Sequence, residues 1–459
     1  FAAAVAEAGG PVGDPAGPWV DPASAGRPYG SAVEGLLTFR GNPTRTYHGA
    51  GPVPASPQVA WRFPAAGGLC SPSRDQHGLR TWCGTGWTGQ PAVFPRGGRT
   101  WVVFGAYDRN VHFLDAETGT RLLPDFPTGD IIKGSVTVDP DGFPLVYTGS
   151  RDNKLRVLAI DRDRPTELWR LDARASRPTL WNDDWDASPL VLGDHLLVGG
   201  ENSRFYVIRL NRSYGPDGAV RVAPEVVVDV PGWDAQLLAD LGDKAVSIEG
   251  SVAVSGDVAY FANSGGLVQG WSLAGLAHGR PAERVFRFWT GDDTDASVVI
   301  DEAGALYVAS EFERGNARSR QVGQFMKLDP SRPDNPLVWR IEDQATRPAG
   351  GWATPALHRD LALFVTHGGQ VLAVDRASGA RRWSLKLPGP TWQSPVVVDD
   401  TLVIGDCAGV LHGYELGDGA SPPPERWRVQ LEGCIESTPA VWRGSIYVGA
   451  RGGAVYGLR

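Results

Sequence analysis

The sequence lacks the features that mark nucleic-acid-binding and membrane-spanning proteins. Only five of its 44 basic residues are lysine, and the formal net charge is −8. With no run of basic residues, the chain has no electrostatic footprint for nucleic acid or for an anionic membrane surface. No stretch of about 18 or more apolar residues occurs, so no hydrophobic helix long enough to cross a bilayer is expected.

Cysteine is scarce, and its spacing excludes common metal and haem motifs. The chain has four cysteines, Cys70, Cys83, Cys407 and Cys434, and none lies in a CxxC or CxxCH pattern. Cys70 and Cys83 flank a polar loop, and the later two fall in consecutive repeats at positions that can meet. We therefore expect two disulfides and an oxidising compartment. Four buried thiols are the alternative.

Short catalytic motifs are also missing. The eight histidines form no HExxH pattern, which argues against a zinc site. No GxSxG occurs, which argues against a nucleophile elbow but leaves other hydrolases open.

The first 30 residues are rich in Ala, Gly and Pro, and the chain begins at Phe1. We interpret residues 1–30 as a flexible tail left after removal of an export signal, and residues 31–459 as one domain. The protein is then secreted or otherwise extracytoplasmic, with anchoring through the removed segment as one option.

What the sequence does contain is an internal repeat. Trp339, Trp383 and Trp427 follow one another at intervals of 44 residues. Each repeat has a short apolar run, a polar turn, an alternating strand, a glycine-containing turn, a second alternating strand and a tryptophan strand. A period of about 40 to 50 residues built from such strands is typical of β-propeller blades.

Eight such repeats can be placed along the chain. The longest insertion spans residues 211–247, and one short helix is expected near Asp234 to Leu241. The residues that open the repeats are Gln90, Ser135, Ser188, Ser251, Ser297, Thr354, Ser394 and Thr438. The predicted fold is therefore an all-β, eight-bladed propeller with four-stranded blades.

The two ends of the chain complete one blade. The last repeat stops at Arg459 before its tryptophan strand, and the missing strand is found at residues 58–64, QVAWRFP. An N-terminal strand that completes the C-terminal blade closes the ring and removes two sheet edges.

The segments FLDAETGTRL (residues 113–122) and AVDRASGARRW (residues 373–383) resemble the core of PQQ-like repeats. In that core Gly379 permits a tight turn and Trp383 packs between blades. The resemblance covers roughly residues 55–459. The family includes quinoprotein dehydrogenases and the propeller lipoprotein of the bacterial outer-membrane assembly machine, so the fold alone does not choose a function.

The sequence has only some of the features of the quinoprotein dehydrogenases in this family. The segment WNDDWDASPLVL (residues 181–192) is similar to a W-D-x-D stretch of quinoprotein alcohol dehydrogenases. The adjacent cysteine pair that covers the quinone in those enzymes is absent, as is a haem motif. The resemblance leaves PQQ as an open alternative.

Ligand sites in propellers commonly form where the innermost strands begin around the channel. The residues two positions before each repeat opening are Thr88, Lys133, Asp186, Glu249, Asp295, Trp352, Trp392 and Glu436. Four of these are carboxylates, which repel one another unless a cation binds. Asp186, Glu249, Asp295 and Glu436 are therefore candidate ligands for Ca²⁺ or another hard cation. Oxygens of the Asp183-Asp184 and Asp292-Asp293 pairs lie at the same level.

Other side chains in this ring suggest contacts with an organic ligand. Lys133 can neutralise a carboxylate or hold an anionic group, and Trp352 and Trp392 offer flat faces for stacking. The alternative is a hydrated channel in which the charges are solvated. Glu311 and Glu313 start an insertion that can fold over one face of the propeller. They are expected to be solvated, and the alternative is that they join the site.

Two functions follow from these residues. The first is a binding scaffold for a small ligand or for another extracytoplasmic protein. The second is a metal-dependent enzyme, such as an atypical quinoprotein oxidoreductase, with Asp186 or Asp295 as general base and Lys133 polarising the substrate. The sequence leaves open whether the protein is an enzyme, and a closed propeller is expected to be a monomer.

Overall fold

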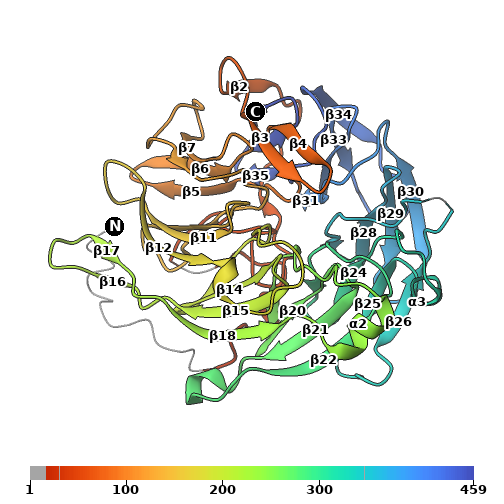
Figure 1. The fold of residues 1–459 in the computed structure, drawn as a ribbon. Helices are drawn as coiled ribbons and strands as arrows, with labels where there is room; N and C mark the ends of the chain where they lie inside the picture. The colour runs from red at the N-terminus through yellow and green to blue at the C-terminus, as the bar shows by residue number, and fades with distance from the viewer. Residues whose placement is uncertain (1–16, 30–31, 346) are drawn as a thin grey trace.

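A computed structural model describes residues 17–29, 32–345 and 347–459, and it contains eight antiparallel sheets arranged in a ring (Figure 1). Seven of these sheets have four strands, and the eighth has four antiparallel strands plus the short parallel strand β1. The predicted eight-bladed propeller is confirmed.

The blades are numbered here from the N-terminal side, and their strands are as follows. Blade 1 has β5 (Ala92–Arg96), β6 (Arg99–Gly105), β7 (Asn110–Asp115) and β8 (Phe126–Pro127). Blade 2 has β9 (Thr137–Val138), β10 (Leu145–Thr148), β11 (Lys154–Ala159) and β12 (Thr166–Asp172). Blade 3 has β13 (Leu190–Leu192), β14 (His195–Gly200), β15 (Arg204–Arg209) and β18 (Glu225–Pro231). Blade 4 has β19 (Ala253–Ser255), β20 (Val258–Phe261), β21 (Leu267–Ser272) and β22 (Glu283–Trp289).

The second half of the ring has the same order of strands. Blade 5 has β23 (Val299–Ile300), β24 (Leu306–Ala309), β25 (Phe325–Leu328) and β26 (Leu337–Ile341). Blade 6 has β27 (Ala356–His358), β28 (Leu361–Val365), β29 (Gln370–Asp375) and β30 (Arg381–Lys386). Blade 7 has β31 (Val396–Val398), β32 (Thr401–Gly405), β33 (Val410–Glu415) and β34 (Glu425–Gln430). Blade 8 has β1 (Gly49–Ala50), β35 (Ala440–Trp442), β36 (Ser445–Ala450), β37 (Ala454–Leu458) and β2 (Val59–Phe63).

Every innermost strand begins two residues after the repeat opening that the sequence predicts, from β5 at Ala92 to β35 at Ala440. The short inner strands are rich in Val, Ile and Leu and are almost fully buried, because neighbouring blades cover both faces of each sheet. The repeat pattern therefore located all eight blades.

The ring is closed as predicted by the N-terminal strand β2. It pairs antiparallel with β37, with Val59 opposite Leu458 and Trp61 opposite Gly457. The pairing continues into the chain end, where the Gln58 N–H donates to the Arg459 carbonyl at 2.7 Å.

Tryptophan side chains join consecutive blades. The Trp61 Nε1–H of blade 8 donates to the Ala116 carbonyl of blade 1 at 3.0 Å. The indole ring lies against Gly119, whose φ of +68° and lack of a Cβ permit the close approach. Trp339 of blade 5 makes the equivalent bond to Arg376 of blade 6, beside Gly379. The aspartate-to-glycine turn and the tryptophan of the repeat thus meet across the interface between blades.

A segment that the repeat analysis did not identify closes the channel. Residues 36–50, called here the plug, are almost entirely buried and contact the inner strands around the ring. Backbone bonds run between Leu36 and Val93 of blade 1, from Val138 of blade 2 to Leu37, from Val254 of blade 4 to Pro43 and from Ile300 of blade 5 to Thr44. The strand β1 at its end pairs with β35 of blade 8.

Two arginines of the plug are fully buried. Arg40 donates to the carbonyls of Pro355 and Pro395, in blades 6 and 7. Arg45 donates to the Val252 carbonyl of blade 4 through Nε and Nη2, at 2.9 and 2.6 Å, and to the Phe39 carbonyl at 2.7 Å. Burial lowers the pKa of each guanidinium to about 9. Backbone carbonyls thus replace water around these two cations.

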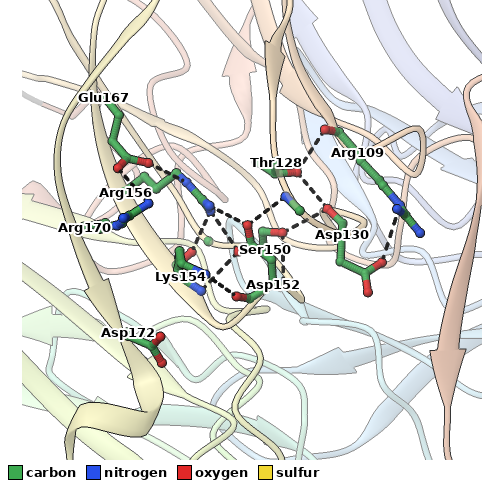
Figure 2. Close-up of polar contacts among 12 residues, drawn as sticks. Arg109, Thr128, Asp130, Ser150, Asp152, Lys154, Arg156, Glu167, Arg170 and Asp172 are labelled. Carbon is green, nitrogen blue, oxygen red and sulfur yellow. Dashed lines mark hydrogen bonds and ion pairs between the residues drawn. The ribbon is translucent and has the colours of Figure 1, made fainter.

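Polar contacts also fix the loop between blades 1 and 2 (Figure 2). The Gly129 N–H donates to Asp152 at 2.8 Å, and the Thr128 and Ser150 hydroxyls donate to the Asp130 carbonyl at 2.7 and 3.0 Å. Arg156 in turn pairs with Asp152. This network holds the loop that carries Lys133 to the channel.

Helices and disulfides are few. The expected short helix is confirmed as α2 (Ala235–Leu241), capped by Asp234, and a further helix is α3 (Ala317–Val322). Short 3₁₀ turns are η1 (Pro22–Ser24), η2 (Ala173–Ala175) and η3 (Leu276–His278). Two hairpins lie outside the blades: β3 (Cys70–Asp75) pairs with β4 (Gly78–Cys83), and β16 (Ser213–Tyr214) pairs with β17 (Val220–Arg221).

Both expected disulfides are present, Cys70–Cys83 and Cys407–Cys434. None of the described helices has the length and apolar character needed to cross a membrane.

The predicted N-terminal tail packs against the propeller over part of its length. Residues 1–16 and 30 lie outside the described residues. Trp19, Val20 and Tyr29 are buried, and the Trp19 N–H donates to Asp257 at 3.0 Å. We therefore propose that the ordered unit includes residues 17–29, which the predicted boundary at residue 30 excluded.

Candidate functional site

A cavity of about 540 Å³ lies at the mouth of the channel. Its lining comes from segments that precede inner strands, from the turns that follow second strands and from the β3–β4 hairpin. The lining residues are Arg80, Thr81, Trp82, Trp87, Tyr107, Lys133, Glu249, Asp295, Trp352, Trp392, Glu436 and Arg451. The plug contacts begin further along the same inner strands, so the plug closes the channel beneath the cavity.

Each blade supplies two residues to this level of the channel. One precedes the inner strand, as the sequence predicts. The second residue lies in the turn after the second strand of the blade. In seven blades its backbone N–H donates to the carbonyl of the residue two positions before the first channel residue of the same blade; for example, the Glu201 N–H donates to the Asp184 carbonyl, and the Glu311 N–H donates to the Asp293 carbonyl. The second set is Tyr107, Arg151, Glu201, Ser264, Glu311, His367, Cys407 and Arg451.

The first acidic group joins Asp186 and Glu201 of blade 3 to Glu249 of blade 4. One carboxylate oxygen from each lies within 4.8 Å of the other two. Lys133 forms an ion pair with Asp186 and lies 3.7 Å from Glu201. One oxygen each of Asp186 and Glu201 is buried without a hydrogen-bond partner among the described residues. One lysine is thus shared by three carboxylates.

The electrostatics of this group follow from burial. Burial and the nearby Asp186 raise the pKa of Glu201 well above its usual value, and burial raises that of Glu249 against the opposing effect of Lys133. Burial disfavours the charged form of Lys133, but the surrounding carboxylates outweigh it and raise its pKa well above the ordinary value. Lys133 is therefore a fixed positive charge.

The second acidic group comprises Asp293, Asp295 and Glu311 of blade 5, whose oxygens also lie within 4.8 Å of one another. Burial raises the pKa of all three well above the usual range, and each is raised further by another member of the group. No lysine or arginine forms an ion pair with these three carboxyls within the described part of the chain. The Ser264 hydroxyl donates to Asp295 at 2.9 Å.

The second acidic group is joined to the indole rings of the cavity wall. The Trp392 Nε1–H donates to His367 Nδ1 at 3.0 Å, so the other ring nitrogen, Nε2, carries the proton and donates to Glu311 at 3.2 Å. Burial lowers the pKa of His367 to about 4. A neutral histidine therefore links Glu311 to the Trp392 ring, and the Trp352 ring packs edge-on against the same histidine.

The opposite wall of the cavity carries balanced charge. Arg451 pairs with Glu436 at 3.0 Å and lies over the rings of Trp82 and Tyr107. Trp82 comes from the β3–β4 hairpin, whose base is closed by the Cys70–Cys83 disulfide. This side is aromatic like the other but has no excess of negative charge.

Six of the eight predicted channel residues line the cavity: Lys133, Glu249, Asp295, Trp352, Trp392 and Glu436. The four predicted metal ligands do not come together as one set. Asp186 and Glu249 lie in the first acidic group, Asp295 in the second, and Glu436 pairs with Arg451.

The paired aspartates near the channel have separate roles. Asp184 pairs with Arg151 at 2.6 Å, while burial raises its pKa to about 7. Asp292 accepts the N–H groups of Arg314 and Gly315, which holds the loop after β24.

The expectation that Glu311 is solvated is wrong. It is 1% exposed, because the loop after β24 folds inward, whereas Glu313 is exposed. Glu201 and Arg451 were also missed. The signal that could have found all three is their shared place, two residues after a small residue at or next to the end of the second strand: Gly199, Ala309 and Gly449.

Comparison with known proteins identifies the repeat. A family model described as outer membrane protein assembly factor BamB matches residues 233–420. Among solved structures, BamB from Moraxella catarrhalis is 17% identical, with 80% of this chain and 95% of that chain covered and a TM-score of 0.57. The match identifies the repeats within residues 233–420 as PQQ-like.

Enzymes share this PQQ-like fold. Quinohemoprotein alcohol dehydrogenase from Comamonas testosteroni is 13% identical over 92% of this chain and 80% of that chain, with a TM-score of 0.58. A europium-containing methanol dehydrogenase is 13% identical over 90% and 89%, with a TM-score of 0.54. No curated protein matches the sequence. At these identities the likeness extends to the fold alone.

Proposed function

We propose that this chain is an extracytoplasmic binding propeller that holds a small ligand in the cavity at the mouth of its channel. The observation that carries the proposal is the combination found at one place. A cavity of about 540 Å³, closed beneath by the plug, is lined by indole rings and by the carboxyl groups of Glu249 and Asp295. Each of these two carboxyls belongs to an acidic group in which other buried oxygens have no hydrogen-bond partner among the described residues.

Such oxygens destabilise the folded protein when no ligand is bound. A buried polar atom without a hydrogen bond costs free energy, and a buried charge costs more. A ligand that donates to these oxygens would recover that free energy. The cavity volume falls within the range of about 300 to 1,000 Å³ typical of small-molecule sites.

An extracytoplasmic location is supported by the two disulfides, which persist in oxidising compartments. The match to a family described as an outer membrane protein assembly factor supports the same location. It also supports a protein partner, which would use the outer faces of the blades and leave the cavity to the small ligand.

The proposal is tested by a thermal-shift screen of small polar and aromatic molecules in chelator-containing buffer. The double variant Glu249→Gln/Asp295→Asn is screened in parallel, since both side chains line the cavity. Compounds that stabilise the natural protein and lose at least tenfold in affinity for the variant support the proposal. Compounds that bind both proteins equally would place binding elsewhere and contradict it.

A second candidate is a metal-dependent enzyme of the quinoprotein type, favoured by the two acidic groups. Their oxygen donors suit Ca²⁺, and Asp186 or Asp295 would act as general base. The fit to PQQ itself is partial. Trp352 and Trp392 could stack on the quinone, which supplies the redox chemistry when bound, but Lys133 and Arg451 are already paired with Asp186 and Glu436.

Metal content separates the two candidates. The protein is equilibrated with Ca²⁺, Mg²⁺ and Mn²⁺, desalted and analysed by mass spectrometry, with Asp186→Ala/Glu249→Ala and Asp293→Ala/Asp295→Ala as separate variants. About one retained ion per chain, lost in one variant only, favours the enzyme and names its acidic group. Absence of retained metal from all three proteins favours the binding propeller.

A further inference from the structure

We infer that the cavity takes an organic cation, whose ammonium group lies between the acidic side chains of blades 4 and 5 and the indole rings of Trp352 and Trp392. The inference rests on the proposed function and specifies its ligand class. It follows from the order of residue types around the ring, in which an acidic arc is followed directly by an aromatic arc.

The acidic arc has more carboxyl groups than cations paired with them. Glu249, Asp295 and Glu311 follow one another over blades 4 and 5, and Asp293 lies beside them. The cations near this side are engaged elsewhere: Lys133 and Arg151 pair with Asp186 and Asp184 of blade 3. Arg314, whose charge lowers the pKa of Asp293, donates to the Ser264 carbonyl and pairs with Asp243. Glu311 lies behind the cavity wall and is 1% exposed, but one of its oxygens is within 4.8 Å of an oxygen of Asp295, which lines the cavity. One Glu311 oxygen has no hydrogen-bond partner in the described ranges.

The aromatic arc is held rigid. The rings of Trp352 and Trp392 lie 5.3 Å apart at an angle of 41°, and both contact His367: Trp392 through its indole N–H and Trp352 through an edge-on ring contact at 4.7 Å. Both rings line the cavity, so their faces are available to a ligand. Aromatic faces attract cations, and the attraction strengthens when water is excluded.

The charge, shape and size together exclude other ligand classes. An anion would face the unpaired carboxylates of the acidic arc. A bare metal ion would use the carboxylates but leave most of a 540 Å³ cavity and its indole rings unused. An ammonium group attached to a carbon skeleton uses both the charge and the rings.

The test is isothermal titration calorimetry at pH 8 in chelator-containing buffer with four probes. Choline and 1,5-diaminopentane carry ammonium groups, 3,3-dimethylbutan-1-ol is the uncharged counterpart of choline, and benzoate is an anion. We expect at least one ammonium probe to bind, and the alcohol and benzoate to bind at least tenfold more weakly.

The variants place the binding site. Trp352→Leu and Glu311→Gln should each weaken binding about tenfold, in line with the loss of a desolvated cation–π or charge contact. Asp295→Asn is a second carboxylate variant in case Glu311→Gln unfolds. Tyr214→Leu and Glu415→Gln, which change exposed side chains outside the cavity, should bind as the natural protein does.

The outcomes separate the inference from the proposed function. Equal binding of choline and its uncharged counterpart overturns the inference. Displacement of the bound ammonium probe by stoichiometric Ca²⁺, added after transfer to chelator-free buffer, also overturns it. If benzoate or the alcohol binds in a Trp352-dependent manner and the ammonium probes do not, the inference fails while the binding cavity stands. If ammonium probes bind with no dependence on Trp352, Glu311 or Asp295, both fail.

Discussion

The carboxyl groups of Asp293, Asp295 and Glu311 link the stability of the protein to pH. Their pKa values are raised on folding by burial and by one another, so the folded chain holds protons that the unfolded chain has released. Such groups favour the folded state at low pH and lose that effect as the pH rises through the folded-state pKa. Stability without ligand should therefore fall as the pH rises above about 4, the usual carboxyl pKa.

Replacing one carboxyl by its amide tests this point. Glu311→Gln is expected to raise the free energy of unfolding by about 2 kcal/mol at pH 8 and to change it little at pH 4, because only the ionised group is penalised by burial. Denaturant unfolding at pH 4, 6 and 8 measures the difference, with the exposed Glu415→Gln as control. A change of equal size at all three pH values would contradict the account.

His367 has the opposite dependence. Its pKa is lowered by burial to about 4 from an ordinary 6.5, so the folded state excludes a proton that the unfolded chain binds. The contribution is complete above pH 6.5 and is lost as the pH falls through about 4. Relative to His367→Gln, the natural protein should lose up to about 3 kcal/mol of stability between pH 7 and pH 4. A constant difference across that range, in the same unfolding assay, would show that His367 is not held neutral.

At the scale of elements, the plug closes the channel beneath the cavity. Arg45 donates to the carbonyls of Val252 and Phe39, and these acceptors would lose their donors in Arg45→Met. Because unsatisfied buried carbonyls are costly, the variant should lose about 2 kcal/mol of stability or more. Thermal or denaturant unfolding measures it, and exposed Arg170→Met should be near neutral. Stability equal to that of the natural protein would mean that the plug contacts contribute little.

The same scale shows why some elements were predictable and others were not. The inner strands were located because each is a short apolar run that begins two residues after a repeat opening, which is Ser or Thr in seven repeats and Gln90 in the first. The plug has no such periodicity, since it contacts eight blades through irregular backbone and carries none of their repeat. Glu311 was assigned to solvent because an acidic loop residue is usually exposed, and only the inward fold of the loop after β24 shows otherwise.

For the whole molecule, stability depends on closing the ring. Trp61 is a buried residue of the N-terminal strand in blade 8, and it also contacts the turn of blade 1. Trp61→Ala should cost about 3 to 5 kcal/mol, as for other large buried aromatic residues. The exposed Trp181→Ala is the matched control and should cost about 0.5 kcal/mol or less. Equal losses of stability in the two variants would show that the pairing of the N-terminal strand β2 with β37 is not needed to close the ring.

The closed ring was predictable from the sequence because the missing tryptophan strand of the last repeat could be found near the N-terminus. The grouping of charges was not, because the two acidic groups each combine a residue before an inner strand with one from the turn after the second strand. Asp186 meets Glu201 and Asp295 meets Glu311 only when those strands pair.

The central claim is that the channel mouth is the ligand site of this propeller. A crystallographic screen of small charged and neutral compounds tests it most directly. The account predicts that bound compounds gather in the cavity between Trp352, Trp392 and Glu249, and that they are lost from crystals of the Glu249→Gln/Asp295→Asn variant. Compounds found only on the outer faces of the blades, with none in the cavity across the screen, would contradict it.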